Sequence, residues 1–188
     1  MKLNLANRRT LVDCINTPKI TKGVEVGVRT GWYSKYILDN SYMTLDSVDP
    51  WEKNEELSTP EECYEFCKNL LLPYGDRSKM IKGYSPSVCE QYENESLDFV
   101  YIDGLHTYEA VKADIEGWYP KVKKNRLICG HDFNPIKWIG VVKAVNEFCK
   151  NNNLEFYLTG TVGNAISSKT GDVDEFDGDE QSWVVIKK

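Results

Sequence analysis

The segment Lys22-Gly23-Val24-Glu25-Val26-Gly27-Val28-Arg29-Thr30-Gly31 decides the fold. Its apolar part, Gly23 to Val26, predicts a short core strand, and a helix is expected to follow from Trp32. Gly27 and Gly31 favour a tight turn that lets a ligand approach the backbone closely. A strand, a glycine turn and a helix in this order are typical of the place where a nucleotide-like molecule meets the carboxyl edge of a parallel sheet.

Strand-like and helix-like segments alternate along most of the chain. Beyond the first strand, the expected strands are 45–48, 80–82, 97–102, 126–129, 154–158 and 182–186, and the expected helices are 3–15, 32–38, 59–72, 87–92, 107–118 and 141–150. This alternation predicts an α/β fold, a doubly wound, Rossmann-like sheet with helices on both faces. The last two strands have no helix between them, so they predict an antiparallel hairpin at one edge of a seven-stranded, mostly parallel sheet.

The length and charge of the chain limit its function. Its 188 residues suit a single domain spanning 1–188, with an N-terminal helix within 1–20 and an acidic hairpin loop at 168–181. The chain has 29 acidic and 23 basic side chains, a net charge of −6. Nucleic acids and anionic membranes are bound through basic surfaces, so this balance argues against both partners. The basic residues within 121–126 are interpreted as a solvent-exposed turn.

The cysteines and the N-terminal sequence bear on the compartment. None of the six cysteines forms a Cys-x-x-Cys pair, which predicts reduced, mostly buried thiols in a cytosolic protein. The polar segment 1–9 lacks the apolar core of a signal peptide. No apolar run reaches the roughly 20 residues of a membrane span. A cytoplasmic location is therefore expected.

Acidic residues stand where four of the predicted strands end, namely Glu25, Asp49, Asp103 and Asp132. The carboxyl ends of parallel strands meet at one edge of a doubly wound sheet, so these side chains are expected to lie together. Packing does not explain them, because carboxylates are rarely buried without partners. Asp49 also lies 18 residues after Gly31, a distance typical of an acid that binds ribose hydroxyls.

The glycine turn does not match the motifs that bind pyrophosphate. The dinucleotide pattern G-x-G-x-x-G requires a second glycine two residues after Gly27, and Arg29 occupies that position. The lysine of a P-loop is also missing from this turn. A ligand without phosphates is thus favoured over a dinucleotide, which makes a nicotinamide-dependent oxidoreductase a less favoured alternative.

With these features the chain resembles the class I S-adenosylmethionine-dependent methyltransferases, in particular the small O-methyltransferases that act on sugars and natural products. The resemblance covers about 22–142 and the closing hairpin. It is carried by four segments, Val24-Glu25-Val26-Gly27-Val28-Arg29-Thr30-Gly31, Leu45-Asp46-Ser47-Val48-Asp49-Pro50-Trp51, Phe99-Val100-Tyr101-Ile102-Asp103-Gly104-Leu105-His106-Thr107-Tyr108 and Leu127-Ile128-Cys129-Gly130-His131-Asp132.

The resemblance implies S-adenosylmethionine as the cofactor. The resemblance implies that Glu25, Gly27 and Gly31, with the adjoining Val28 and Arg29, hold the methionine part of the cofactor. It implies that Asp49 binds the ribose and that Asp103 faces the methyl group. The residues implied for the adenine are Pro50, Trp51, Gly83, Tyr84 and Ser85. One departure is Arg29, where many members of the family carry glycine. Its side chain is expected either to crowd the loop or to point to solvent.

Two kinds of group are candidates for removing the proton of the methyl acceptor. Some members of the family use a divalent cation, and Asp103 and Asp132 offer the oxygen ligands that suit Mg²⁺. His106 or His131 is the alternative, as a general base that titrates near neutral pH. A purely structural role is also open for both histidines, His131 capping a turn and His106 capping the helix that follows it.

The expected function is transfer of a methyl group from S-adenosylmethionine to a small-molecule acceptor, most readily a hydroxyl group. The alternative is a module that binds the cofactor without turnover, because the chain has no long insertion to cover an acceptor. A lid is expected from the N-terminal helix, from 132–140 or from a second subunit, which leaves a homodimer open.

Overall fold

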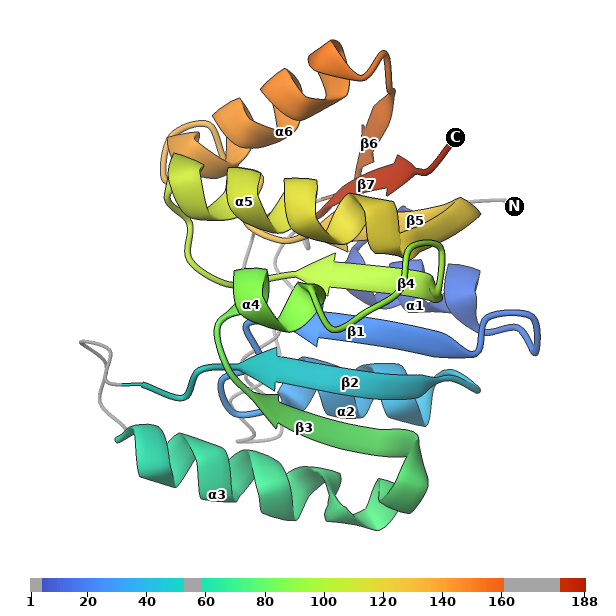
Figure 1. The fold of residues 1–188 in the computed structure, drawn as a ribbon, viewed down its shortest axis with the longest axis vertical. Coiled ribbons are helices and arrows are strands. Elements are labelled where there is room, and N and C mark those ends of the chain that lie inside the picture. Colours follow the sequence, from blue (N-terminus) through green and yellow to red (C-terminus); the bar gives the residue numbers. More distant parts are fainter. Residues whose placement is uncertain (1–4, 53–58, 161–179) are drawn as a thin grey trace.

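Seven strands form one sheet at the centre of the structure, a computed structural model that describes residues 5–52, 59–160 and 180–188 (Figure 1). The strands are β1 (Lys22–Val26), β2 (Thr44–Asp49), β3 (Ser78–Lys82), β4 (Leu97–Ile102), β5 (Val122–Gly130), β6 (Phe156–Leu158) and β7 (Trp183–Ile186). Their order in the sheet is β3-β2-β1-β4-β5-β7-β6. The first five strands pair in parallel, and β7 pairs antiparallel with both β5 and β6. The predicted fold, including the antiparallel pair at one edge, is confirmed.

The helices form a layer on each face of this sheet. They are α1 (Arg8–Ile15), α2 (Trp32–Asp39), α3 (Pro60–Leu71), α4 (Ser85–Cys89), α5 (Tyr108–Trp118) and α6 (Ile139–Asn151), with short 3-10 helices at Leu72–Arg77 and Tyr119–Lys121. The apolar sides of α1, α2 and α3 pack in one core cluster, and those of α4, α5 and α6 pack in the other. In Figure 1, α4 and α5 lie in front of the sheet and α1 and α2 lie behind it.

The central strand β4 shows why the sequence forms this sandwich. All six of its residues are buried, as expected for a parallel strand covered on both faces. Phe99 and Tyr101 face the cluster of α1, α2 and α3, whereas Val100 and Ile102 face the opposite cluster. Because successive side chains of a strand alternate between its faces, a continuous apolar run is needed to fill both layers.

The strand order reverses direction between β1 and β4. From β1 the chain proceeds outward to β2 and β3, then returns to place β4 on the other side of β1. In doubly wound sheets such a switch point opens a crevice at the carboxyl ends of the two strands. The glycine turn 27–31 follows β1 directly and lies at this position.

Two helices differ in extent from the sequence prediction. Helix α1 begins at Arg8, because Asn7 caps it by accepting hydrogen bonds from the backbone of Arg9 and Thr10. The expected helix 87–92 is found as α4, which begins at Ser85 and has Pro86 in its first turn. Most of the expected acidic loop 168–181 lies outside the described residues, as do residues 1–4 of the expected N-terminal helix. Within the described part of the chain, no helix is both long and apolar enough to cross a membrane.

The prediction of a solvent-exposed basic turn within 121–126 is only partly correct, since Lys124 is exposed but 122–126 lie within a strand. Strand β5 begins at Val122, so Lys123 and Arg126 belong to the sheet. Both side chains form ion pairs with Asp98, at 3.0 Å and 3.1 Å. The sequence signal was misleading because the acid that balances these charges lies on the neighbouring strand β4.

Asp98 is a buried acid that joins the amino-terminal ends of three strands. It is 1% exposed and accepts a hydrogen bond of 3.0 Å from the backbone of Thr21, just before β1. Burial alone would raise the pKa of Asp98, but hydrogen bonds from Thr21, Lys123 and Arg126 lower it below its ordinary value. The carboxylate is thus stabilised in its charged form.

We expect Asp98→Ala to lower the free energy of unfolding by about 1.5–3 kcal/mol, because the backbone of Thr21 and the partly exposed side chains of Lys123 and Arg126 lose a charged hydrogen-bond acceptor. The pKa of Asp98 is lower in the folded protein than in the unfolded chain, where it is near 4. The ionised carboxylate therefore stabilises the fold fully at pH values above the unfolded pKa. This stabilisation is lost as the pH falls toward and below the pKa of the folded protein. Urea unfolding between neutral pH and about pH 3 measures both effects. Asp76→Ala, at an exposed acid, is the control. Equal acid sensitivity in wild type and Asp98→Ala would contradict the assignment.

Candidate functional site

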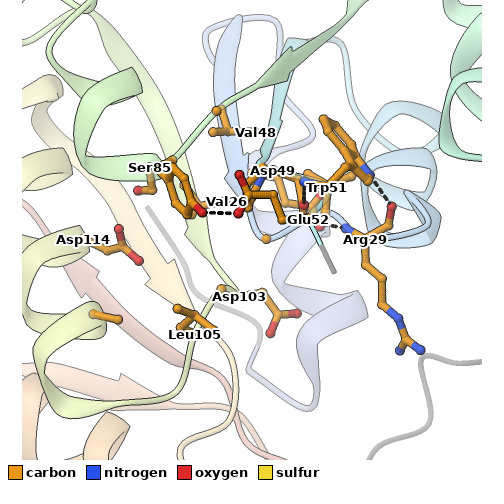
Figure 2. Close-up of a pocket in the computed structure, with 18 of the residues that line it drawn as sticks. Val26, Arg29, Val48, Asp49, Trp51, Glu52, Ser85, Asp103, Leu105 and Asp114 are labelled. Atoms are coloured by element: carbon orange, nitrogen blue, oxygen red, sulfur yellow. Dashed lines mark hydrogen bonds between the residues drawn. The ribbon is translucent and has the colours of Figure 1, made fainter. Parts of the chain in front are cut away.

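A cavity of about 1010 Å³ lies at the carboxyl ends of β1, β2 and β4 (Figure 2). Glu25, Asp49, Asp103 and Asp132 all line it. The structure thus brings together the four strand-end acids that the sequence singled out. The shared edge follows from the parallel register, in which the last residues of β1 lie beside those of β2 and β4.

The glycine turn closes one wall of the cavity. Gly27 has φ 83°, and its backbone nitrogen donates a hydrogen bond of 2.9 Å to the carbonyl of Val48 on β2. A Cβ on Gly27 would lie 2.0 Å from the carbonyl oxygen of Asp103. Only glycine fits there, because both the left-handed backbone and the close approach exclude a side chain. Gly31, in contrast, caps α2 and is not among the residues that line the cavity.

Asp49 is held rigidly at the end of β2. Its carboxyl oxygens accept hydrogen bonds from the backbone nitrogens of Arg29 at 2.9 Å and of Trp51 at 2.7 Å. The indole nitrogen of Trp51 donates to the carbonyl of Arg29 at 2.7 Å, which joins the two loops (Figure 2). Arg29 lines the cavity, and in this view its guanidinium group lies on the opposite side of Asp103 from Asp114.

Glu25 lies at the bottom of the cavity and is 2% exposed. Its carboxyl group accepts a hydrogen bond from the Ser34 hydroxyl, which is 2.7 Å from the Ser47 hydroxyl. Burial raises the pKa of Glu25 to about 8, against the opposing effect of the Ser34 hydrogen bond. A cationic ligand group beside Glu25 would favour the ionised carboxylate and offset the cost of burying it.

Two acids and two histidines meet after β4 and β5. His106 Nε2 is 2.5 Å from one Asp132 oxygen, and His131 Nδ1 is 3.3 Å from the other. His131 Nδ1 also lies 3.7 Å from Asp103. Asp132 and His131 directly follow β5, and Asp132 has φ 57°, a strained backbone often found at functional sites.

The charges in this cluster are unequal. Burial raises the pKa of Asp103, and the nearby Asp132 adds to this effect while His131 and Arg8 oppose it. Burial would likewise raise the pKa of Asp132, but hydrogen bonds from His106 and His131 hold it well below its usual range. For His106, burial would lower the pKa, and the hydrogen bond to Asp132 raises it instead. The result is a firmly ionised Asp132 paired with His106.

The same cluster contains donor atoms in a metal-binding arrangement. One ligand atom each from Asp103, His131 and Asp132 lies within 4.8 Å of the others. Two carboxylates are suited to Mg²⁺, and the imidazole nitrogen extends the choice to Mn²⁺. These three residues therefore fit a divalent cation.

The two histidines differ in their access to the cavity. His106 lines it, whereas His131 is 8% exposed and lies behind the cavity wall. The ring of His106 also packs on Trp138, with centroids 4.2 Å apart. Trp138 thus supports His106 and is not among the residues that line the cavity.

The other residues expected at the cofactor site also lie around the cavity. Those that line it are Glu25, Gly27, Val28, Arg29, Asp49, Pro50, Trp51, Gly83, Tyr84, Ser85 and Asp103. Trp51 is 3% exposed and packs against Tyr64, so most of its indole belongs to the core.

Sequence reasoning missed three charged residues of the cavity, Arg8, Glu52 and Asp114. Arg8 comes from α1, before the recognised segments, and its Nη1 lies 3.6 Å from Asp103. No local sequence signal marks such a long-range contact. Asp114 did have a signal, because it lies on α5 between the buried residues Val111 and Trp118. An acid on the buried stripe of an amphipathic helix is unusual and points to a specific partner.

A family model described as a methyltransferase domain matches residues 22–133 of the chain. Among curated proteins, the uncharacterized protein y4gI of Sinorhizobium fredii is 30% identical over 87 residues, which are 46% of this chain. The aligned segment is only 10% of that protein, so the chain corresponds to a small part of its curated relative.

Solved structures share the fold at low sequence identity. The O-methyltransferase from Bacillus cereus, in complex with SAH, is 16% identical with a TM-score of 0.65, over 95% of this chain and 80% of that chain. A putative rRNA-methylase from Clostridium thermocellum is 12% identical with a TM-score of 0.67, over 100% of this chain and 99% of that chain. Because the family model covers more than half of the sequence and the sheet has the matching topology, the chain belongs to the class I S-adenosylmethionine-dependent methyltransferase family.

Proposed function

We propose that this protein transfers a methyl group from S-adenosylmethionine to a hydroxyl group of a small-molecule acceptor. The observation that carries the proposal is a single cavity that contains the glycine turn, Asp49 and the paired His106 and Asp132. Cofactor-binding groups and a candidate proton acceptor thus face the same space. The net charge of −6 favours a small molecule over a nucleic acid as the acceptor.

The cofactor would lie along the carboxyl ends of β1 and β2. Its ribose hydroxyls would donate to Asp49, whose oxygens are oriented by two backbone hydrogen bonds. Its positively charged methionine ammonium would lie near Glu25 and Asp103, the acids beside the turn. Gly27 leaves the room that this approach requires.

The reaction would be an in-line displacement at the methyl carbon. The acceptor oxygen forms a bond to the methyl group, the bond between this carbon and the sulfur breaks, and S-adenosylhomocysteine leaves. The hydroxyl proton would pass to His106, whose Nε2 is engaged with Asp132 and whose Nδ1 is the nitrogen that can accept it. Alignment of the two substrates is the larger contribution of the protein.

A divalent cation is the second way to activate the acceptor. Asp103 and Asp132 would hold Mg²⁺, with His131 as a nitrogen ligand in the same cluster. When bound, the cation would lower the pKa of a coordinated hydroxyl group. His106 would then hold Asp132 in place through their ion pair.

Further proposals concern location and assembly. All six cysteines are buried, which fits the thiols of a protein in a reducing compartment such as the cytoplasm. The chain would act as a single domain in which α1 contributes Arg8 to the cavity wall. The alternative is a homodimer in which the second copy of the chain covers the cavity as a lid. Light scattering of the purified protein distinguishes a monomer from such a dimer.

We expect Asp49→Asn to weaken binding of S-adenosylhomocysteine by about 1–3 kcal/mol, because charge-assisted hydrogen bonds to the ribose are lost. Isothermal titration calorimetry measures this. Asp46→Asn is the matched control, since Asp46 lies on the same strand and its side chain accepts from Tyr92 outside the cavity. An unchanged dissociation constant in Asp49→Asn would show that the ribose lies elsewhere. Tight binding of NAD without binding of S-adenosylhomocysteine would instead indicate an oxidoreductase.

We expect Asp103→Asn to lower methyl transfer by about 100-fold while the fold is retained, because the charge that positions the methionine ammonium or the cation is lost. The measurement is S-adenosylhomocysteine release over a panel of sugar and phenol acceptors, with thermal unfolding as the check on folding. Full activity in this variant would remove Asp103 from the reaction. Cofactor binding by the wild type without turnover on any acceptor would favour a cofactor-binding module.

Binding of the cation to the protein can be measured without a methyl acceptor. Mg²⁺ is expected to raise the melting temperature of the wild type, because a ligand that binds only the folded state stabilises it. The shift should be absent in Asp132→Asn and kept in Glu116→Gln, an exposed acid on α5. A wild type that does not respond to Mg²⁺ or Mn²⁺ would leave His106 as the base.

A further inference from the structure

Two buried hydroxyl groups stand behind Glu25, the acid at the bottom of the cavity. Glu25 belongs to β1, Ser34 to α2 and Ser47 to β2, so three elements bring these side chains together. Glu25 is 2% exposed, and both serines are 0% exposed. The proposed reaction uses only the carboxyl group and gives the two serines no role.

The three side chains form a short chain of hydrogen bonds that starts at the cavity. The Ser34 hydroxyl donates to Glu25, and the hydroxyl oxygens of Ser34 and Ser47 are 2.7 Å apart. Either serine can donate in the second hydrogen bond, because a hydroxyl group both donates and accepts. Beside an ionised carboxylate, Ser47 donates to Ser34 and Ser34 donates to Glu25. Beside a protonated carboxyl group both donor directions can reverse, so the network accommodates either protonation state of Glu25.

The surroundings that the protein itself provides favour the protonated form of Glu25. Burial raises the pKa of Glu25 to about 8, against the opposing effects of the Ser34 hydrogen bond and of Arg8. Among the residues that the structure describes, no basic side chain forms an ion pair with Glu25. Arg8 pairs with Asp103 instead, at 3.6 Å. A buried carboxylate without a cationic partner is costly, so the proton is retained.

Other titratable groups face Glu25 from the elements packed around it. They are Arg8 on α1, Tyr33 on α2, Asp49 at the end of β2, Cys67 on α3 and Asp103 after β4. Burial raises the pKa of Tyr33 well above 10 and that of Cys67 to about 12, so both stay neutral near pH 7. Burial also raises the pKa of Asp103, so an experiment has to separate this acid from Glu25.

We propose that Glu25, Ser34 and Ser47 form a proton-linked binding site, in which Glu25 is protonated in the free protein and becomes ionised when the ammonium group of the cofactor binds beside it. The O–H bond of the carboxyl group breaks, and the proton leaves to solvent through the cavity that Glu25 lines. Ser47 is fully buried, so the proton does not leave on that side and the hydroxyl groups only reverse their donor direction. The inference rests on the proposed binding of S-adenosylmethionine.

The linkage makes the affinity for the cofactor depend on pH. Below the pKa of Glu25 the ligand has to displace a proton, so binding strengthens as the pH rises and levels off above this pKa. Ser34 is a positioning residue here, because it acts on the ligand only through Glu25. Its hydrogen bond opposes the effect of burial, and its removal should therefore raise the pKa of Glu25 further.

Titration calorimetry measures the released protons directly. S-adenosylhomocysteine is titrated into the purified protein at about pH 7 in buffers of different ionisation enthalpy, with EDTA present to remove cations. The slope of the observed enthalpy against the ionisation enthalpy gives the number of protons released. The matched ligand is 5′-deoxy-5′-methylthioadenosine, which has the nucleoside and the sulfur but no ammonium group. The variants are Glu25→Gln and Ser34→Ala, and Asp46→Asn on β2, outside the cavity, is the control.

The wild type and Asp46→Asn are expected to release about 0.9 proton per S-adenosylhomocysteine near pH 7. Their association constant should rise about 10-fold between pH 6 and 7 and level off above about pH 8. Glu25→Gln should bind without proton release and without this pH dependence. Ser34→Ala should move the plateau to higher pH, whereas a merely structural serine would change the melting temperature and leave the pH profile in place. Methylthioadenosine should release no proton.

Three results would overturn the inference and leave the proposed function standing. They are binding of S-adenosylhomocysteine without proton release, equal release with methylthioadenosine, and release retained in Glu25→Gln, which would assign the proton to Asp103. If Glu25→Gln does not fold, an unshifted plateau in Ser34→Ala counts against the inference in its place. A wild type that does not bind S-adenosylhomocysteine would overturn the proposed function itself.

Discussion

The close contact between the ends of β1 and β4 is the constraint on which the rest of the site depends. Gly27 turns so near to the Asp103 carbonyl that no side chain fits between them. The Asp103 backbone nitrogen donates to the carbonyl of Val26 at 2.7 Å, which continues the sheet up to the turn. This contact places the backbone of one strand end against the acid of the next. The cavity, its acids and the entry to α2 all take their positions from it.

The acids that this contact brings together differ in how their charges are compensated, and these differences support the roles proposed for them. Asp49 is oriented by backbone donors, and Asp132 is paired with His106. Glu25 and Asp103 have raised pKa values because burial is only partly offset. Buried acids without full compensation require a cation or a donor, and the methionine ammonium or a metal ion would supply one. The site is therefore electrostatically incomplete without its ligands.

Much of the fold was predictable because its signals are local. The apolar run of β4, the capping residue Thr59 before α3 and the glycines after β1 each determine nearby structure. The acids at the strand ends were predictable for a geometric reason, since parallel strands end at one edge. The start of β5 was not predictable from its composition. Lys123 and Arg126 belong in a strand only because Asp98 on β4 neutralises them.

The sequence by itself determined the α/β architecture, the place of the candidate site and the four strand-end acids beside it, Glu25, Asp49, Asp103 and Asp132. These follow from hydrophobic periodicity and from glycine's freedom at positive φ, which are properties of short segments. Only the tertiary structure decided that His106 faces the cavity while His131 lies behind it, and that Arg8 and Asp114 line it. Those outcomes depend on contacts between residues far apart in the chain, and no local pattern encodes such distances.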